Sequence, residues 1–205
     1  MTAKTGDRVL KGQTVTYNGQ VVSKEEEMIL IALNKPAGIV CTAEKREKNN
    51  VIDYLNYPKR IYPIGRLDKD SEGLLLLTNS GDLIQAMMRG ANRHEKEYIV
   101  KVDKEITDAF LTKMSQGIYL KDLDIKTREC SLKKTGKYTF QIILTQGVNR
   151  QIRRMCEACG YRVKALKRIR IMNILLGDLK PGKWREVTGE ELEQLQRDTG
   201  MLNRN

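Results

Sequence analysis

The sequence lacks the features by which membrane-spanning and secreted proteins are recognised. No apolar run in its 205 residues comes close to the roughly 20 residues that cross a bilayer, and no apolar signal-peptide core follows the N-terminus. We therefore expect a cytoplasmic protein without membrane attachment.

Aromatic residues are also scarce. They make up only 5% of the chain, which argues against a surface that stacks several nucleobases at once.

Cysteine and histidine are too scarce for a metal site or a disulfide framework. Cys156 and Cys159 form a C-x-x-C pair, but a zinc site needs a second such pair or two histidines. Cys41 and Cys130 are isolated, and His94 is the single histidine. Because the C-x-x-C pair falls in a helical pattern, where cysteine packs as a small apolar residue, we expect reduced cysteines and no metal.

Common nucleotide-binding and nucleophilic motifs are absent as well. The chain has neither a G-x-x-x-x-G-K-[ST] phosphate loop nor a G-x-G-x-x-G turn after a strand. A Ser-His-Asp or Cys-His site would need His94, which lies in the charged run Arg93–Glu97. A magnesium site on neighbouring carboxylates (Asp68, Asp70, Glu72) remains a minor alternative. We expect no cofactor.

Positive charge is in clear excess. Lysine and arginine number 37 against 26 aspartates and glutamates, which gives a net charge of +11. Such an excess favours a polyanionic partner, most simply nucleic acid, although a basic protein without one remains an alternative. With 40% hydrophobic residues, the chain has enough apolar material for a folded core.

The chain divides near residue 23. Before this point, short alternating strands flank an Asn18-Gly19 turn, and the segment is too small to own a core. From Met28 onward the sequence predicts strands at 28–33, 61–65, 74–78, 98–102 and 138–144, and helices at 82–88, 107–117, 149–158 and from a capping box at 188. Because strands and helices mix without regular alternation, we predict an α+β fold with a mainly antiparallel sheet over residues 24–205.

A polar loop between two of these apolar strands is the first candidate for a functional site. Gly65–Gly73 reads GRLDKDSEG, and a loop fixed at both ends by buried strands is a good platform for catalysis. Leu67 precedes Asp68 and would draw this carboxylate towards the interior, where a cationic partner would keep it ionised. A solvated surface turn is the alternative.

A basic segment supplies candidate partners. Between Asn149 and Ile171 the only acid is Glu157. Helical spacing places three arginines on one side of a helix, and strand alternation projects four further bases to one face: Arg150, Arg153, Arg154, and then Arg162, Lys164, Arg168, Arg170. The scarcity of acids favours phosphate binding over a merely solvated basic face.

A tyrosine at the start of a predicted strand is the third candidate. Tyr98 follows Glu95-Lys96-Glu97, and its ring could stack on a nucleobase. The alternative is an ordinary half-buried sheet residue. One such contact is enough for an enzyme that acts on a single extruded base.

Several segments together resemble the RsuA/RluB/RluF family of bacterial pseudouridine synthases, from about Met28 to Leu195. The segments are LNKPAG (33–38), YPIGRLDKDSEGLLLLTN (62–79), HEKEY (94–98), GVNRQIRRM (147–155) and KALKRIRIMNI (164–174). HEKEY together with RIRIMN is most similar to the RluF branch. The resemblance implies a bent, largely antiparallel sheet around a central cleft, and a reaction without metal or organic cofactor.

The resemblance also implies residue roles. The acid of G-R-L-D, Asp68, would be the catalytic aspartate, and Arg153 would pair with it. Arg66 would enter the RNA and support the flipped nucleotide, while Tyr98 would pack on the uracil and take part in proton removal. Contacts to RNA phosphates would come from the remaining bases, Arg150, Arg154, Lys164, Arg168 and Arg170.

Members of the RluF branch modify 23S rRNA, and some also modify tRNA. The resemblance therefore implies 23S rRNA as the partner and leaves open whether tRNA is a second one. We expect a monomer. The family usually begins with an S4 RNA-binding domain. Residues 1–23 resemble only the last part of such a domain, without its helices, so the module is either shortened or degenerate. A non-catalytic RNA-binding module and a ribosomal structural protein are the alternative functions.

Overall fold

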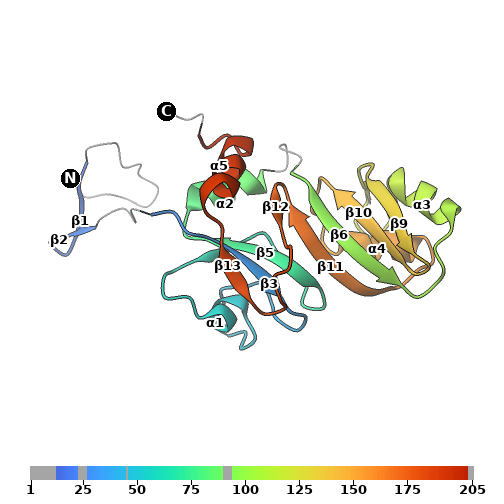
Figure 1. The fold of residues 1–205 in the computed structure, drawn as a ribbon, viewed down its shortest axis with the longest axis horizontal. Coiled ribbons are helices and arrows are strands. Elements are labelled where there is room, and N and C mark those ends of the chain that lie inside the picture. The colour runs from blue at the N-terminus through green and yellow to red at the C-terminus, as the bar shows by residue number, and fades with distance from the viewer. Residues whose placement is uncertain (1–12, 23–26, 45, 90–93, 203–205) are drawn as a thin grey trace.

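A nine-stranded sheet crosses the molecule in the computed structural model (Figure 1), which describes residues 13–22, 27–44, 46–89 and 94–202. Its main path runs in the order β13-β3-β5-β11-β6-β10-β9. In chain order these strands are β3 (Leu30–Lys35), β5 (Glu72–Thr78), β6 (Lys96–Val102), β9 (Ser131–Gly136), β10 (Thr139–Leu144), β11 (Val163–Ile171) and β13 (Trp184–Glu186). Off this path, β4 (Tyr62–Ile64) pairs with β5 and β12 (Ile174–Leu175) pairs with β11.

Strand direction confirms the predicted α+β class. Each neighbouring pair on the main path is antiparallel except β5–β11, which is parallel through Lys167↔Glu72 and Arg168↔Gly73. Gly73 has a φ of +105°, and a Cβ there would collide with the carbonyl oxygen of Arg168. Glycine is therefore required at the point where these two strands meet.

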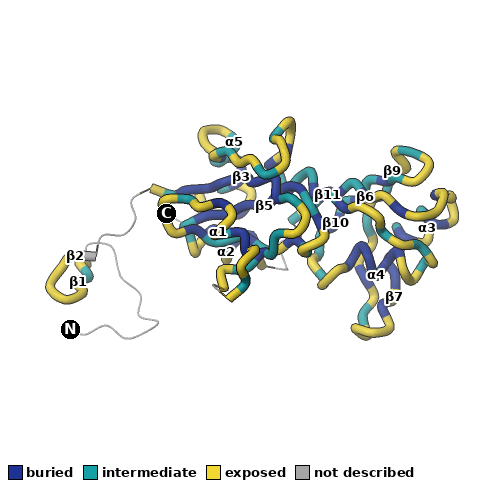
Figure 2. Tube along the Cα trace, turned by 90° about the horizontal axis from the view of Figure 1, so that it is seen from below, coloured by how far each residue is buried: buried dark blue, intermediate teal, exposed yellow. Residues whose placement is uncertain are grey.

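Both faces of the central strands are buried, as the dark-blue stretches of β3 and β5 show in Figure 2. Along β3, Ile31 and Leu33 belong to one core cluster while Leu30 and Ala32 belong to the other, as the two-residue period of a strand requires. The first cluster takes in helices α1 (Val51–Leu55), α3 (Asp108–Ser115) and α4 (Gln151–Ala158), and the second takes in α2 (Gly81–Met88) and α5 (Gly189–Asp198).

Two small hairpins stand outside this sheet. β1 (Val15–Tyr17) and β2 (Gln20–Val22) form the predicted N-terminal hairpin, whose turn residues Asn18 and Gly19 have φ angles of 51° and 77°. The rest of the proposed 1–23 segment, residues 1–12 and 23, lies outside the described residues. The second hairpin pairs β7 (Tyr119–Leu120) with β8 (Ile125–Lys126).

Some predicted boundaries and one predicted cap need correction. β3 continues to Lys35 because Asn34 and Lys35 pair with Leu74 and Gly73 of β5, and the buried Lys35 ammonium donates to the carbonyls of Pro36 and Ile39, at 2.8 and 2.9 Å. The helix expected from residue 149 begins at 151, because Arg150 adopts the left-handed conformation with φ 50°. The predicted capping box at Thr188 does not form: the Thr188 side chain makes no cap bond, and the carboxylate of Glu191, the other half of the box, pairs with Arg185.

The cysteines pack as predicted. Cys41 and Cys156 are buried, Cys130 and Cys159 are partly buried, and all four thiols are free. Among the described residues, no three histidine, cysteine, aspartate or glutamate side chains are grouped so as to hold a metal ion. The same part of the chain contains no helix that is long and apolar enough to cross a membrane.

Candidate active site

A cavity of about 650 Å³ opens where the Gly65–Gly73 loop faces β6, β11 and the start of α4. Asp68, Tyr98 and Arg153 all line it, as do Arg66, Arg150 and Arg168. The structure therefore brings these six predicted residues to one cavity, although they lie far apart in the sequence.

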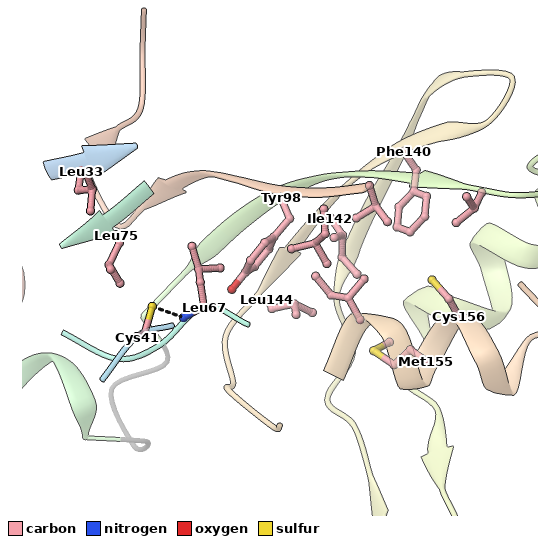
Figure 3. Close-up of a cluster of buried hydrophobic side chains, with 14 of the residues drawn as sticks. Leu33, Cys41, Leu67, Leu75, Tyr98, Phe140, Ile142, Leu144, Met155 and Cys156 are labelled. Atoms are coloured by element: carbon pink, nitrogen blue, oxygen red, sulfur yellow. Dashed lines mark hydrogen bonds between the residues drawn. The ribbon is translucent and has the colours of Figure 1, made fainter. Parts of the chain in front are cut away.

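The loop that carries Asp68 is fixed from several sides. Leu67 is buried, and its amide donates a hydrogen bond to the Cys41 Sγ at 3.4 Å (Figure 3). The amide of Gly38 donates to the Lys69 carbonyl at 2.7 Å, and the amide of Ser71 donates to the Asp68 carbonyl at 3.1 Å. The sequence predicted Leu67 as an anchor but gave no sign of Cys41 or Gly38 as supports. Together these contacts hold the carboxylate at the cavity wall.

Two arginines lie beside the Asp68 carboxylate. Asp68 Oδ2 is 3.7 Å from Arg150 Nη1 and 3.9 Å from Arg153 Nε, and 28% of the aspartate side chain is exposed. The predicted Arg153–Asp68 ion pair is thus present, at the long end of the range. Arg153 Nε is buried and makes no hydrogen bond. Contacts of this kind often tighten when substrate binds.

Asp70 is held more tightly than Asp68. Arg150 donates to both of its carboxylate oxygens at 3.2 Å, and Arg153 Nη2 lies 3.2 Å from Asp70 Oδ2. Partial burial raises the pKa of the Asp70 carboxyl, but the hydrogen bond from Arg150 and the charges of both arginines outweigh it and hold this pKa below its usual value. Arg150 is therefore engaged by carboxylates, whereas the sequence predicted that it faces phosphate alone.

Tyr98 is buried in the main core beside Leu67 (Figure 3), and it lines the cavity with its ring. Its hydroxyl makes no hydrogen bond to any residue that the structure describes. Tyrosine hydroxyls in a protein interior usually have a partner, and this one, on a side chain that lines the cavity, is available to a bound molecule.

The expected single basic face on β11 is wrong, because the strand carries a bulge. The register of β11 against β6 shifts between Arg168 and Arg170. As a result, Arg168 lies opposite Tyr98 and Arg170 lies opposite Glu97. The two arginines consequently point to opposite faces of the sheet. Arg168 is 2% exposed and donates to the carbonyl of Leu74 at 2.7 Å. Arg170 pairs with Glu97 and with Glu95.

The remaining predicted bases lie elsewhere. Arg154 pairs with Asp122 and donates to the Asn149 carbonyl, so it does not share a contact surface with Arg153. Lys164 is exposed on β11 outside the cavity lining, while Arg66 is exposed at its rim. The helical spacing of the arginines was correct, but their partners on distant loops have no local signal in the sequence.

Lys96 is the most notable of the cavity residues that were not predicted as part of the site. Lys96 stands two residues before Tyr98 on the same face of β6 and lines the cavity beside it. In the sequence, Lys96 stands out only as part of the charged entry to a strand. Nothing in the local pattern distinguishes its side chain from that of Lys101, which is exposed on the same strand.

Comparisons with known proteins agree with one another. A family model described as RNA pseudouridylate synthase matches residues 29–158. The dual-specificity RNA pseudouridine synthase RluF of Escherichia coli (strain K12) is 51% identical over 195 residues, which cover 94% of this chain and 67% of that protein. The ribosomal large subunit pseudouridine synthase B of Bacillus subtilis (strain 168) is 37% identical over 196 residues, covering 93% of this chain and 80% of that protein.

A solved structure extends the likeness to three dimensions. A crystal structure of a pseudouridylate synthase has a TM-score of 0.77 with this chain at 26% identity, covering 92% of this chain and 83% of that one. The residues matched by the family model include the Gly65–Gly73 loop, β6 and α4, and thus most of the cavity wall.

Proposed function

The chain belongs to the RNA pseudouridylate synthase family, and from this premise we propose that Asp68 is the catalytic aspartate of an RNA pseudouridine synthase. One observation supports the assignment above all. The Asp68 carboxylate, beside two arginines, lines the same cavity as the ring of Tyr98. A uracil that enters this cavity can meet an acid at its ribose and an aromatic ring at its base.

The reaction is an isomerisation at one nucleotide. The bond between uracil N1 and ribose C1′ breaks, the base turns, and C5 bonds to C1′. The proton on C5 is lost and N1 gains one, so no group enters or leaves overall. Asp68 acts at the ribose, either as a nucleophile at C1′ or as the base that takes the 2′ proton. Tyr98, whose side chain lines the same cavity, would take part in removing the C5 proton.

The target base must leave its stack to reach the cavity. Flipping a nucleotide costs a few kcal/mol, which contacts to the displaced strand offset. Arg66 is exposed at the cavity rim and is suited to occupy the space the base leaves. Lys164 and the exposed part of Arg150 would bind neighbouring phosphates, whereas Arg168, Arg170 and Arg154 are engaged by the protein itself.

The substrate is 23S rRNA, with tRNA as a second substrate. The identity to dual-specificity RluF supports this choice, as does the net charge of +11. The enzyme works as a monomer in the cytoplasm, where ribosomal RNA is processed. Residues 1–23, of which the β1–β2 hairpin is the described part, would be the remnant of an S4-like RNA-binding module.

Asp68→Asn tests the proposal directly. Release of tritium from RNA labelled at uridine C5 reports the loss of the C5 proton. We expect the variant to turn over at less than roughly a thousandth of the wild-type rate, since a reacting acid commonly contributes about 10²–10⁴-fold, while RNA affinity stays nearly unchanged. Glu72→Gln is the matched control, because this carboxylate is outside the cavity lining. An Asp68→Asn enzyme with substantial turnover would remove Asp68 from the chemistry.

A further inference from the structure

Two cations on the cavity wall have no part in the function proposed above. Lys96 and Tyr98 project from the same face of β6, and Arg168 lies directly opposite Tyr98 on β11. The β11 bulge produces this arrangement, because it turns Arg168 towards the cavity and sends Arg170 to the other face with Glu97. The ring expected to meet the uracil therefore has a lysine and an arginine beside it.

Neither cation forms an ion pair with a carboxylate in the described ranges of the chain. Arg168 donates to the carbonyls of Leu74 and Arg66, at 2.7 and 3.4 Å, and its Nη2 is buried without a hydrogen-bond partner. The Lys96 ammonium makes no hydrogen bond or ion pair with the part of the chain that the structure describes. Burial, followed by the charge of Arg168, lowers the pKa of Lys96. A half-buried pair of like charges is costly unless an anion joins it.

The reaction produces such an anion. When the C1′–N1 bond breaks, both bonding electrons stay with the base, which becomes a uracil anion with its charge shared among N1, O2 and O4. The base carries this charge until C5 bonds to C1′. We propose that Lys96, supported by the fixed charge of Arg168, stabilises the detached uracil anion. The inference rests on the proposed function of Asp68 and Tyr98.

Depth in the cavity favours the base over a phosphate as the anion. Arg168 is 2% exposed and Tyr98 is 9% exposed, so the group that meets them must enter the cavity itself. RNA phosphates stay on the outside of the strand, where the exposed side chains of Arg66 and Lys69 stand at the rim. A preformed cation at the position where charge develops stabilises the intermediate more than the bound substrate.

The test compares two variants on two substrates. Lys96→Met removes the charge at similar length, and Lys96→Arg retains it. Each is measured in single turnover with saturating RNA that carries uridine or 5-fluorouridine at the target position. Loss of the starting nucleoside is followed by chromatography, because 5-fluorouridine has no C5 proton to lose and cannot be converted to pseudouridine. Fluorine withdraws electrons and makes the detached base a more stable anion, so 5-fluorouridine depends less on help from the protein.

We expect Lys96→Met to slow the uridine reaction by about 10²–10³-fold, the usual loss for one charge-stabilising donor, with RNA affinity within roughly threefold of wild type. The deficit should be at least tenfold smaller on 5-fluorouridine, and Lys96→Arg should recover most of the rate. Equal deficits on both substrates would overturn the inference, as would a Lys96→Arg variant as slow as Lys96→Met.

A phosphate contact would give a different result. Affinity would then fall while the saturated rate stayed unchanged, and the salt slope would drop by about 0.7–0.9 for one phosphate, which also overturns the inference. The activity of the wild-type enzyme distinguishes a failure of the proposed function from a failure of the role proposed for Lys96. If it fails to convert uridine, the proposed function itself fails. If it converts uridine and Lys96→Met is unimpaired, only the role of Lys96 is lost.

Discussion

Arg150 and Arg153 stand at the start of α4 and approach the same two carboxylates from different depths. The side chain of Arg150 is 43% exposed, whereas that of Arg153 is 10% exposed and also donates to Ser71 Oγ and the Asp70 carbonyl. An exposed ion pair contributes little to stability, whereas loss of one member of a buried pair leaves the other charge uncompensated. The two arginines should therefore differ in function although they are one helical turn apart.

We predict that Arg153→Ala lowers the free energy of unfolding by about 2–3 kcal/mol, less than for a fully buried pair because Asp70 is half exposed, and reduces turnover at least tenfold. Arg150→Ala should leave the thermal midpoint nearly unchanged, weaken RNA binding and lower the salt slope by about 0.7–0.9. Thermal unfolding and salt titrations of RNA binding measure both effects. Equal loss of stability in the two variants would contradict this division.

The hydroxyl oxygen of Tyr98 can be removed by a Tyr98→Phe substitution that leaves the ring in place. Because its hydroxyl has no partner among the described residues, Tyr98→Phe should fold and bind RNA as wild type does, yet form product at least roughly a hundredfold more slowly. Tyr98→Ala should lose RNA affinity as well, since base stacking contributes about 1–3 kcal/mol. Tyr57→Phe is the matched control, because the Tyr57 hydroxyl bonds to Glu186 and lies outside the cavity lining. Full activity of Tyr98→Phe would leave only the ring in the mechanism.

At the scale of elements, local sequence patterns correctly predicted the strands and caps that depend on neighbouring residues alone. The apolar runs became β3, β4 and β5, and Thr107 caps α3 through the Phe110 amide as expected. The β11 bulge had no such signal, because Arg168 and Arg170 obey strand alternation in sequence and only their register with β6 separates them. The contacts of Arg154 and Lys96 likewise depend on segments distant in the chain.

Gly73 allows a direct test of the close contact between β5 and β11. A side chain there meets both the positive φ of +105° and the Arg168 backbone, which cannot move without shifting β11. We expect Gly73→Ala to cost about 2–4 kcal/mol of unfolding free energy, from overpacking and left-handed strain combined. Gly38→Ala isolates the strain, because Gly38 has a φ of +93° with nothing within 4 Å of the added Cβ. Thermal unfolding measures the stability of the two variants. An equal loss of unfolding free energy in Gly73→Ala and Gly38→Ala would contradict the predicted collision with the Arg168 backbone.

For the whole molecule, the net charge of +11 does not say how many positive charges on the surface are available to RNA. Arg168 is buried, and Arg170, Arg185 and Arg154 are paired with acids. Composition therefore predicted the polyanionic partner, but not which charges face it. The N-terminal hairpin adds a separate exposed surface, where Tyr17 is 72% exposed.

If the hairpin contributes to RNA binding as an S4-like remnant, Tyr17→Ala should weaken affinity for RNA by roughly fivefold or more, since stacking of one base contributes about 1–3 kcal/mol. The rate at saturating RNA should stay unchanged, because the cavity is untouched. Tyr138→Ala, at the turn between β9 and β10, is a control at a second exposed tyrosine, which is 41% exposed against 72% for Tyr17. Equilibrium binding and single-turnover rates measure the two quantities, and equal weakening by both variants would argue against a special role for the hairpin.

The parallel pairing of β5 with β11 also has a consequence for the order of folding. The bond from Arg168 to the Leu74 carbonyl joins positions 94 residues apart, and closing so long a loop is entropically unfavourable until other contacts exist. During synthesis, the loop with Asp68 leaves the ribosome well before the strand that carries Arg168. The cavity is therefore completed late, after the antiparallel hairpins have formed, and catalytic activity should be among the last properties recovered on refolding.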